Sequence, residues 1–103
     1  MPLQSYRELN VWQRAMDLVE SVYQIGNRLP KTERFGLTSQ MQRAAVSVPA
    51  NIAEGYGRAH RGDYLRFLSI ARGSLCEVET YLILVQRLNY IPVEDLRPLW
   101  IIA

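Results

Sequence analysis

The amino-acid sequence predicts an all-α protein: an antiparallel up-down-up-down four-helix bundle, formed by a single domain over residues 1–103. Apolar residues recur at the three- and four-residue spacing of amphipathic helices along most of the chain. No segment shows the long alternation of apolar and polar residues that is typical of a strand. The expected connections, near residues 30–36, 56–62 and 89–92, are short, and short connections favour antiparallel neighbours.

The composition is typical of a soluble globular protein with one core. The chain has 103 residues, of which 49% are hydrophobic and 21% are charged. No apolar run approaches the roughly 20 residues that cross a bilayer, and MPLQSYRELN lacks the regions of a secretory signal. We therefore expect a cytoplasmic protein that is not associated with a membrane.

The first helix is expected from about Ser5 to Leu29, because Pro30 pushes the residue before it out of the helical conformation. Its apolar residues form two adjacent stripes, and a face this wide predicts contacts on two sides. The first stripe contains Val11, Ala15, Leu18, Val22, Ile25 and Leu29, and the second contains Trp12, Met16, Val19 and Tyr23.

The second helix is expected to begin near Gly36-Leu37-Thr38, with Thr38 or Thr32 as its cap. Its apolar stripe keeps its phase past an internal proline and contains Leu37, Met41, Ala44, Ala45, Val48 and Ile52.

That proline, Pro49, predicts a kink in the second helix. Pro49 has no N–H for the carbonyl of Ala45, and its ring crowds the same carbonyl. Because the apolar pattern resumes afterwards, we expect the helix to continue until Gly55 or Gly57 supplies the left-handed residue that ends it.

The third helix has the clearest pattern, a heptad seam of the kind found in helix bundles. The seam contains Tyr64, Leu68, Ala71, Leu75, Val78, Leu82 and Val85. Asp63 lies in the first turn, where a negative charge suits the helix dipole. Tyr90-Ile91-Pro92 is expected to end the helix.

A short fourth helix is expected from Pro92, with proline at the first helical position, and Pro98 is expected to interrupt it after fewer than two turns. The apolar segment LWIIA follows, and such segments are rarely exposed. Either it packs into the bundle or the helix continues in a longer parent chain; we favour the second.

The positive charge is concentrated in the middle of the chain, although the net charge is only +2. Eleven of the twelve basic residues are arginine, whose planar fork suits phosphate and carboxylate alike. The candidate nucleic-acid-binding residues are those of residues 40–72: Arg43, Arg58, Arg61, Arg66 and Arg72. The alternative is a solvated face on which arginines pair with carboxylates, for example Arg43 with Glu54.

The stretch SVPANIAEGYGR, residues 47–58, has a structural interpretation. Ser47, Asn51 and Glu54 share one side of the helix, and the first two are expected to satisfy backbone groups at Pro49. Glu54 is expected to accept hydrogen bonds from Arg43 or from loop amides. A contact with a ligand is the alternative.

Enzyme chemistry is not indicated, and we expect no metal or cofactor. GYGR follows a helix and does not open one after a strand, so it does not fit a phosphate-binding loop. The single histidine, His60, falls in an expected loop, and the single cysteine, Cys76, is expected to be a small buried apolar residue.

The aromatic residues at helical spacing are expected in the core or at a subunit interface: Trp12, Tyr23, Phe67, Tyr81 and Trp100. Tyr56 and Tyr64 flank the basic connection and are the two candidates for stacking on bases.

Four segments together resemble a known family. They are LNVWQRAMDLVESVY (9–23), ERFGLTSQMQRAAVSVPANIAEGYGR (33–58), YLRFLSIARGSLCEVETYL (64–82) and LNYI (88–91). The sequence resembles the four-helix-bundle proteins encoded in intervening sequences of bacterial 23S rRNA genes, which are similar to accessory variability proteins of diversity-generating retroelements. The most specific segment is SVPANIAEGYGR, with Ser47, Pro49, Asn51, Glu54, Gly55 and Gly57 as its signature residues.

The resemblance implies a homo-oligomer, a ring of five copies, and members outside retroelements generally have no defined activity. The retroelement relatives bind nucleic acid and a reverse transcriptase. We therefore expect binding of an RNA or DNA backbone; the alternative is a scaffold for a reverse transcriptase or a ribosome-associated protein. The short fourth helix departs from the family pattern.

Overall fold

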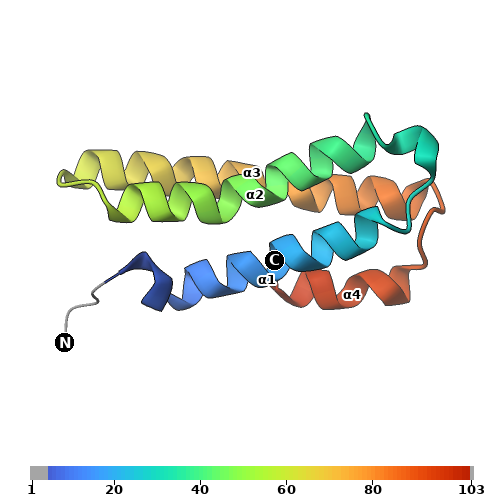
Figure 1. The fold of residues 1–103 in the computed structure, drawn as a ribbon, viewed down its shortest axis with the longest axis horizontal. Coiled ribbons are helices and arrows are strands. Elements are labelled where there is room, and N and C mark those ends of the chain that lie inside the picture. The colour runs from blue at the N-terminus through green and yellow to red at the C-terminus, as the bar shows by residue number, and fades with distance from the viewer. Residues whose placement is uncertain (1–4, 103) are drawn as a thin grey trace.

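The computed structural model describes residues 5–102, apart from the side chain of Ile101, and the protein is a four-helix bundle, as predicted. Figure 1 shows the helices in an elongated arrangement measuring 45 × 23 × 17 Å. Helix α1 packs against α2 and α4, and α3 packs against α2 and α4, so that α1 and α3 lie on one diagonal. The helices are α1 (Asn10–Gly26), α2 (Leu37–Tyr56), α3 (Arg61–Arg87) and α4 (Val93–Ile102), with short 3-10 helices η1 (Tyr6–Glu8) and η2 (Lys31–Glu33).

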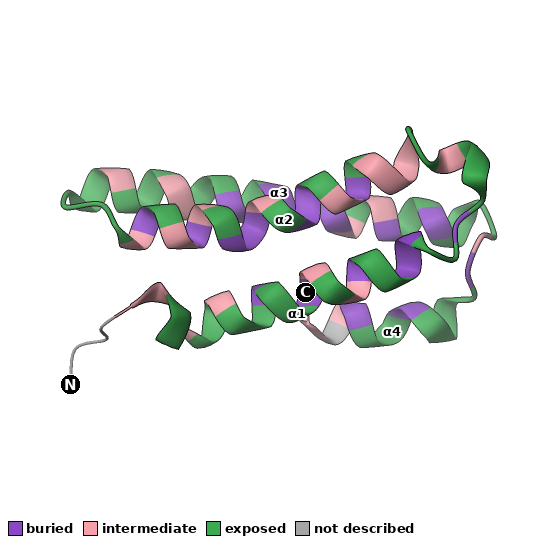
Figure 2. Cartoon of the chain, viewed as in Figure 1, coloured by how far each residue is buried: buried purple, intermediate pink, exposed green. Residues whose placement is uncertain are grey.

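The core consists of the predicted apolar stripes where all four helices meet. Leu18, Val22, Met41, Val78 and Leu82 are fully or almost fully buried there. A second, smaller cluster lies nearer the C-terminal end of α2 and the N-terminal end of α3. It includes Ala15, Val48, Ile52 and Ala71. In Figure 2, α3 changes from purple beside α4 to pink and green toward its N-terminal end, which α4 does not reach.

The first helix is shorter than predicted. Ser5 caps the separate 3-10 helix η1 by accepting a hydrogen bond from the Arg7 N–H at 3.2 Å, and α1 begins only at Asn10. The predicted threonine cap of α2 is also wrong: Gly36 precedes the helix, and the carboxylate of Glu33 accepts from the Leu37 N–H at 3.3 Å. A carboxylate from an adjacent turn therefore performs the capping role.

Helix α4 does not stop at Pro98, contrary to the prediction. It continues to Ile102, because Leu96 and Leu99 are buried on either side of the proline and hold the backbone against the bundle. Proline removes one intrahelical hydrogen bond, and this burial offsets the loss. The apolar segment packs against the core through Leu99, Trp100 and Ile102. A continuation in a longer chain concerns residues outside the described part.

The turn between α3 and α4 is set by Asn89, which has a left-handed backbone with φ of 59°. The Tyr90 N–H donates to the Val85 carbonyl at 3.1 Å, and the Asn89 N–H donates to that of Gln86 at 3.0 Å. These two bonds form a Schellman motif, for which asparagine is suited because it tolerates this conformation. Helix α3 therefore ends at Arg87, slightly earlier than predicted.

Two long-range contacts fix this end of the bundle. Arg28, just after α1, forms an ion pair with Asp95 of α4 at 2.8 Å. The Tyr90 hydroxyl donates to Glu33 at 2.8 Å, which joins the α3–α4 connection to the segment before α2. Within the described residues, none of the helices has the length and apolar character needed to traverse a membrane.

Candidate nucleic-acid interface

The connection between α2 and α3 forms the opposite end of the bundle and carries Arg58. Helix α2 ends at Tyr56, and Gly57 follows with a right-handed φ of −79°. The predicted left-handed glycine is therefore absent from the residues that the structure describes. The Gly57 N–H makes the last regular helical bond, to the Ala53 carbonyl, and the Arg58 N–H donates to the Gly55 carbonyl three residues back, so one tightened hydrogen bond ends the helix.

Gly55 permits the close approach of α2 and α3. It is buried inside α2, and a Cβ added to it would lie 3.1 Å from the Phe67 Cβ and 3.2 Å from the Tyr64 carbonyl oxygen. Gly55 therefore serves to let α2 pack closely against α3, and it does not end α2.

The close packing brings the Phe67 ring within reach of two arginines. The guanidinium carbons of Arg58 and Arg66 lie 4.8 and 4.9 Å from the centroid of the Phe67 ring, within the range of cation–π contacts. One arginine comes from the connection and the other from the first turns of α3. Phe67 is thus half-buried next to charged groups, and its predicted place in the core or at a subunit interface stays a prediction.

Two carboxylates accompany these arginines. Glu54 pairs with Arg58 at 3.0 Å, and Asp63 lies 3.9 Å from Arg66. The partner of Glu54 is thus Arg58 and not Arg43, the pairing considered from the sequence. The four side chains are about half exposed, between 45% and 64%, and pairs at the surface contribute only about 0–1 kcal/mol to stability. Such weak pairs leave the guanidinium groups able to exchange partners.

Arg61 is exposed at the start of α3 and makes no ion pair with a described residue. It belongs to the same end of the bundle as Arg58 and Arg66. We call these three arginines the basic end.

Arg43 and Arg72 lie away from the basic end. At about 1.5 Å per helical residue, Arg43 is about 20 Å along α2 from Tyr56, and Arg72 is about 16 Å along α3 from Arg61. Arg43 lines a shallow hollow between α2 and α3 together with Ser47, Ser74 and Glu77. The structure therefore brings together three of the five predicted residues.

The signature polar residues form a hydrogen-bonded group beside Pro49. Asn51 donates through Nδ2 to the carbonyl and the hydroxyl of Ser47, at 2.8 and 2.9 Å. The Ser74 hydroxyl donates to that of Ser47 at 2.8 Å, which links α3 to α2. The backbone group that Asn51 satisfies is the carbonyl of Ser47. It is not the carbonyl of Ala45, which lacks its usual N–H donor because residue 49 is proline.

This architecture agrees with the comparison with known proteins. The family model described as 23S rRNA-intervening sequence protein matches residues 7–100, which include α1 to α3 and most of α4. The chain belongs to the family of 23S rRNA-intervening sequence proteins. The search of curated proteins found no match.

In this 23S rRNA-intervening sequence protein, the basic end has neighbours that sequence reasoning missed. Tyr6 lines a hollow with Glu54, Gly57 and Arg58, and the Arg7 guanidinium lies 5.9 Å from the centroid of the Tyr6 ring. The sequence predicted one continuous helix from about Ser5. It therefore did not predict this contact, which depends on the separate 3-10 helix η1. The short motif Ser5-Tyr-Arg-Glu8, a capping pattern, was the available signal.

A further aromatic residue, Phe35, was also missed. It lies before α2 at the end opposite the basic end, its side chain is 87% exposed, and the Arg34 guanidinium is 5.4 Å from its centroid. Of the two candidates for stacking on bases, Tyr56 is half-buried and Tyr64 is exposed. They lie near the basic end.

The two residues considered for catalysis are both at the surface. His60 is exposed immediately before α3, as predicted. Cys76 is exposed, whereas the sequence predicted burial, because it lies on the outward side of α3 next to the seam residue Leu75. In residues 5–102, no three His, Cys, Asp or Glu side chains lie close enough together to hold a metal ion.

Proposed function

We propose that this 23S rRNA-intervening sequence protein is a non-catalytic, cytoplasmic homo-oligomer that binds the backbone of RNA or DNA through its basic end. The observation that supports this proposal is the grouping of Arg58, Arg61 and Arg66 around one short connection. Arg43 lies about 20 Å along α2 from Tyr56, and Arg72 lies about 9 Å along α3 beyond Arg66, so the three form the tighter group.

The chemistry of the basic end suits phosphate. Arginine presents two parallel N–H groups to phosphate oxygens, and the Phe67 ring orients two of the three guanidinium groups. Backbone contacts of this kind carry no base sequence, so the expected binding is general and strongly dependent on salt.

Glu54 and Asp63 act as internal competitors for phosphate. Each holds one arginine in an exposed ion pair, and a phosphate would replace the carboxylate at small cost. One copy of the basic end therefore binds weakly in this proposal. A ring of copies, five in the case that the family resemblance implies, would present several such ends to one nucleic acid and bind much more tightly.

Charge reversal at the basic end tests the proposal. We expect a fluorescent 20-nucleotide RNA, and a DNA of the same length, to bind the wild-type protein at low salt in an anisotropy titration. The double variant Arg58→Glu, Arg61→Glu should bind at least ten times more weakly, because two phosphate contacts become repulsive.

The matched control carries the same change of charge at the other end of the bundle. Arg87→Glu, Arg97→Glu reverses two exposed arginines, at the end of α3 and in α4. It should retain most of the affinity. Equal loss in both double variants, or no binding by the wild type at low salt, contradicts nucleic-acid binding at the basic end and leaves the protein-scaffold alternative.

The homo-oligomer is tested separately by the mass in solution. Light scattering across a range of protein concentrations should give a mass of at least two copies of the 11.9 kDa chain. A stable monomer at high concentration contradicts this part of the proposal.

A further inference from the structure

The connection between α1 and α2 carries an aromatic ring that lies in solvent. Phe35 is 87% exposed, and the next most exposed of the described large apolar side chains, Val11, is 56% exposed. Single exposed apolar residues are common, but a phenylalanine this open forgoes most of the stabilisation that burial of its ring would give. This connection lies at the end of the bundle opposite the basic end (Figure 1).

Hydrogen bonds on both sides of Phe35 fix the backbone that presents the ring. The Arg34 N–H donates to the Lys31 carbonyl at 3.1 Å, and the Gly36 N–H donates to the Glu33 carbonyl at 3.0 Å. The Glu33 carboxylate in turn accepts hydrogen bonds from the first residue of α2 and from the α3–α4 connection. Because the backbone around the ring is already ordered, a ligand would bind Phe35 with little loss of conformational freedom.

Two cations accompany the ring. The Arg34 guanidinium lies 5.4 Å from the Phe35 centroid, and Lys31 lines the same hollow as both residues. Neither cation forms an ion pair with a described residue. We call Lys31, Arg34 and Phe35 the Phe35 platform.

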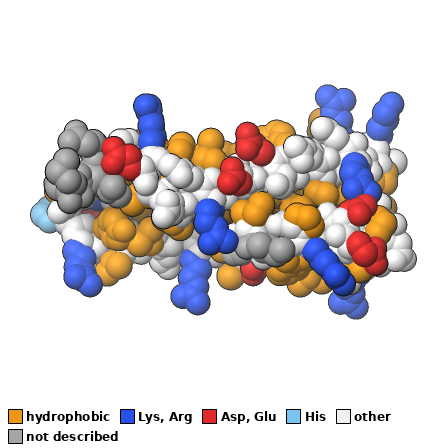
Figure 3. Space-filling model, turned by 90° about the horizontal axis from the view of Figure 1, so that it is seen from below, with side chains coloured by type: hydrophobic (Ala, Val, Ile, Leu, Met, Phe, Trp, Pro, Cys, Tyr) orange, Lys and Arg blue, Asp and Glu red, His pale blue; other side chains and the backbone are white. Residues whose placement is uncertain are grey.

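Carboxylates also lie at this end of the bundle, but other groups hold them or they belong to another helix. Glu33 accepts hydrogen bonds through both of its oxygens. Glu94 and Asp95 belong to α4, which does not contact α2 within the described residues, and Asp95 is paired with Arg28. In Figure 3, where the histidine marks the end with the α2–α3 connection, Lys and Arg side chains project from the opposite end as well, with Asp and Glu among them.

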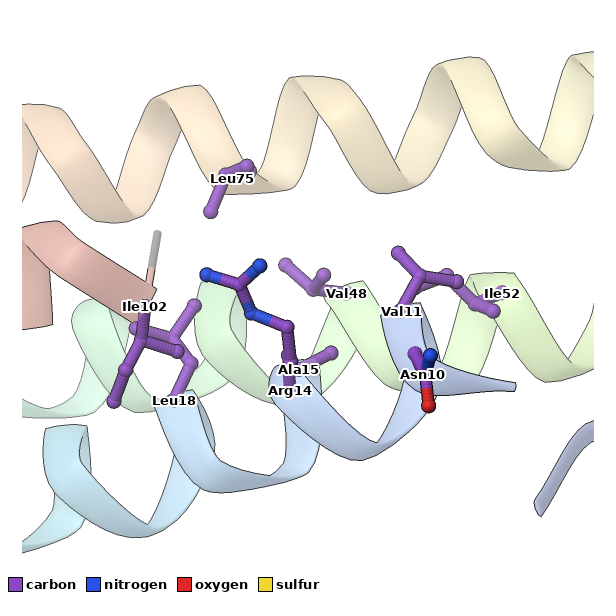
Figure 4. Close-up of a pocket in the computed structure, with 9 residues that line it drawn as sticks. All are labelled: Asn10, Val11, Arg14, Ala15, Leu18, Val48, Ile52, Leu75 and Ile102. Atoms are coloured by element: carbon purple, nitrogen blue, oxygen red, sulfur yellow. The ribbon is translucent and has the colours of Figure 1, made fainter. Parts of the chain in front are cut away.

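A hollow of about 450 Å³ lies beside the Phe35 platform, between the end of α1 and the start of α2. Its lining is mostly polar, whereas the hollow in Figure 4 is lined mostly by apolar side chains. Asn27, Ser39 and Gln42 contribute amide and hydroxyl groups that both donate and accept hydrogen bonds. Gly26 lets Gln42 lie close against α1, because a Cβ added to Gly26 would lie 2.9 Å from the Gln42 Nε2.

These features together suit an unpaired nucleotide. A nucleobase stacks on an aromatic ring, its edge carries donors and acceptors, and the phosphates beside it attract cations. The Arg34 guanidinium can cover only one face of the Phe35 ring, so the other face is open to a base. A base inside a duplex has no free face for Phe35, and an acidic peptide would use the cations without the ring.

We propose that the Phe35 platform binds an unpaired nucleotide of the same RNA or DNA strand that contacts the basic end. The base stacks on Phe35, and its edge faces Ser39 and Gln42 in the hollow. Helix α2 separates the two ends by about 30 Å, which about nine stacked nucleotides of one strand span. This inference rests on the proposed function and adds that the preferred nucleic acid is single-stranded.

A single-stranded RNA and a duplex RNA of the same length test the inference. The anisotropy titration uses a 20-nucleotide RNA without self-complementarity and the 20-base-pair duplex that it forms with its complement. Phe35→Ala should weaken binding of the single strand at least about fivefold, because one stacked base is lost, and should leave the affinity for the duplex unchanged. Ile70→Ala, which truncates an exposed apolar residue of α3, should change neither affinity.

Three further substitutions distinguish stacking from a merely apolar contact. Phe35→Tyr keeps a flat ring and should retain the affinity for the single strand, whereas Phe35→Leu should lose as much as Phe35→Ala. In Phe35→Trp, the tryptophan emission should fall when a base stacks on the new ring, and the wild type, with only Trp12 and Trp100, gives the background. Because Phe35 is exposed, these variants should fold, and circular dichroism checks this.

Failure of this inference and failure of the proposed function give different results. If Phe35→Ala does not change the affinity for the single strand, while Arg58→Glu, Arg61→Glu lowers it, the inference is overturned and binding at the basic end stands. Phe35 would then be an anchor for a protein partner. The reverse pattern contradicts binding at the basic end and supports the Phe35 platform.

Two other results would also overturn the inference. They are an equal loss of affinity for single strand and duplex in Phe35→Ala, and full affinity for the single strand in Phe35→Leu, because neither requires a stacked base. Arg87 and Arg97 do not line the hollow, so their reversal remains the control for the basic end.

Discussion

At Gly55, packing between helices decides the residue type. A Cβ added to Gly55 would lie so close to the carbonyl of Tyr64 and the Cβ of Phe67 that α3 would have to shift by a few tenths of an ångström, which favours glycine inside α2 despite its low helix propensity. The same approach puts Phe67 within reach of Arg58. A single small residue thus shapes the basic end, although it makes no contact with a partner itself.

Gly73 in α3 serves as the control for Gly55, because a Cβ added to Gly73 would meet no other atom within 4 Å. We predict that Gly73→Ala raises the free energy of unfolding by about 0.5–1 kcal/mol, the gain in helix propensity. Gly55→Ala should instead lower it by about 1 kcal/mol, because overpacking against α3 exceeds the same gain. Urea unfolding of both variants measures the difference; equal stabilisation would show that α2 and α3 separate easily.

At the level of elements, Glu33 joins three parts of the chain. One carboxylate oxygen accepts from the Leu37 N–H at the start of α2, and the other accepts from the Tyr90 hydroxyl after α3. The hydrogen bond to Glu33, followed by slight desolvation and the charge of Glu33, raises the pKa of Tyr90 above its ordinary value of 10.0.

This shift predicts a pH dependence. The folded protein holds the Tyr90 proton more tightly than the unfolded chain, so the stabilisation is complete below pH 10.0 and is lost as the pH rises through the higher folded pKa. The thermal midpoint of the wild type should exceed that of Tyr90→Phe at about pH 8, and the difference should shrink above pH 10. A difference that stays constant over this range would mean that the hydrogen bond to Glu33 does not contribute.

The elements differ in how far the sequence predicts them. The stripes of α2 and the seam of α3 are visible because core packing repeats every three or four residues, as at Met41 and Val78. The continuation of α4 past Pro98 depends on the burial of Leu96 and Leu99 against other helices, and local propensity carries no such information.

The features of the candidate site also differ in how far the sequence predicts them. Arg58, Arg61 and Arg66 are close in sequence and meet at one end, as helical spacing predicts. Their contacts with Phe67 and the pairing of Glu54 with Arg58 depend on the side-chain geometry of the α2–α3 packing.

For the whole molecule, the two ends of the bundle have different roles. One end fixes the helices through Arg28–Asp95 and Tyr90–Glu33, and the other carries the basic end. The contacts that hold the helices together therefore lie apart from the arginines of the basic end that are proposed to contact nucleic acid.

The salt dependence of RNA binding tests the central claim most directly. Each phosphate contact adds about 0.7 to the slope of log affinity against log salt for a single strand, so three arginines predict a slope of about −2 for one basic end, and steeper for an oligomer. Arg58→Ala, Arg61→Ala should make the slope less steep by at least about 1.4, while Arg87→Ala, Arg97→Ala should not change it. A wild-type affinity that does not vary with salt, or a slope unaffected by the first pair of substitutions, would contradict backbone binding at the basic end.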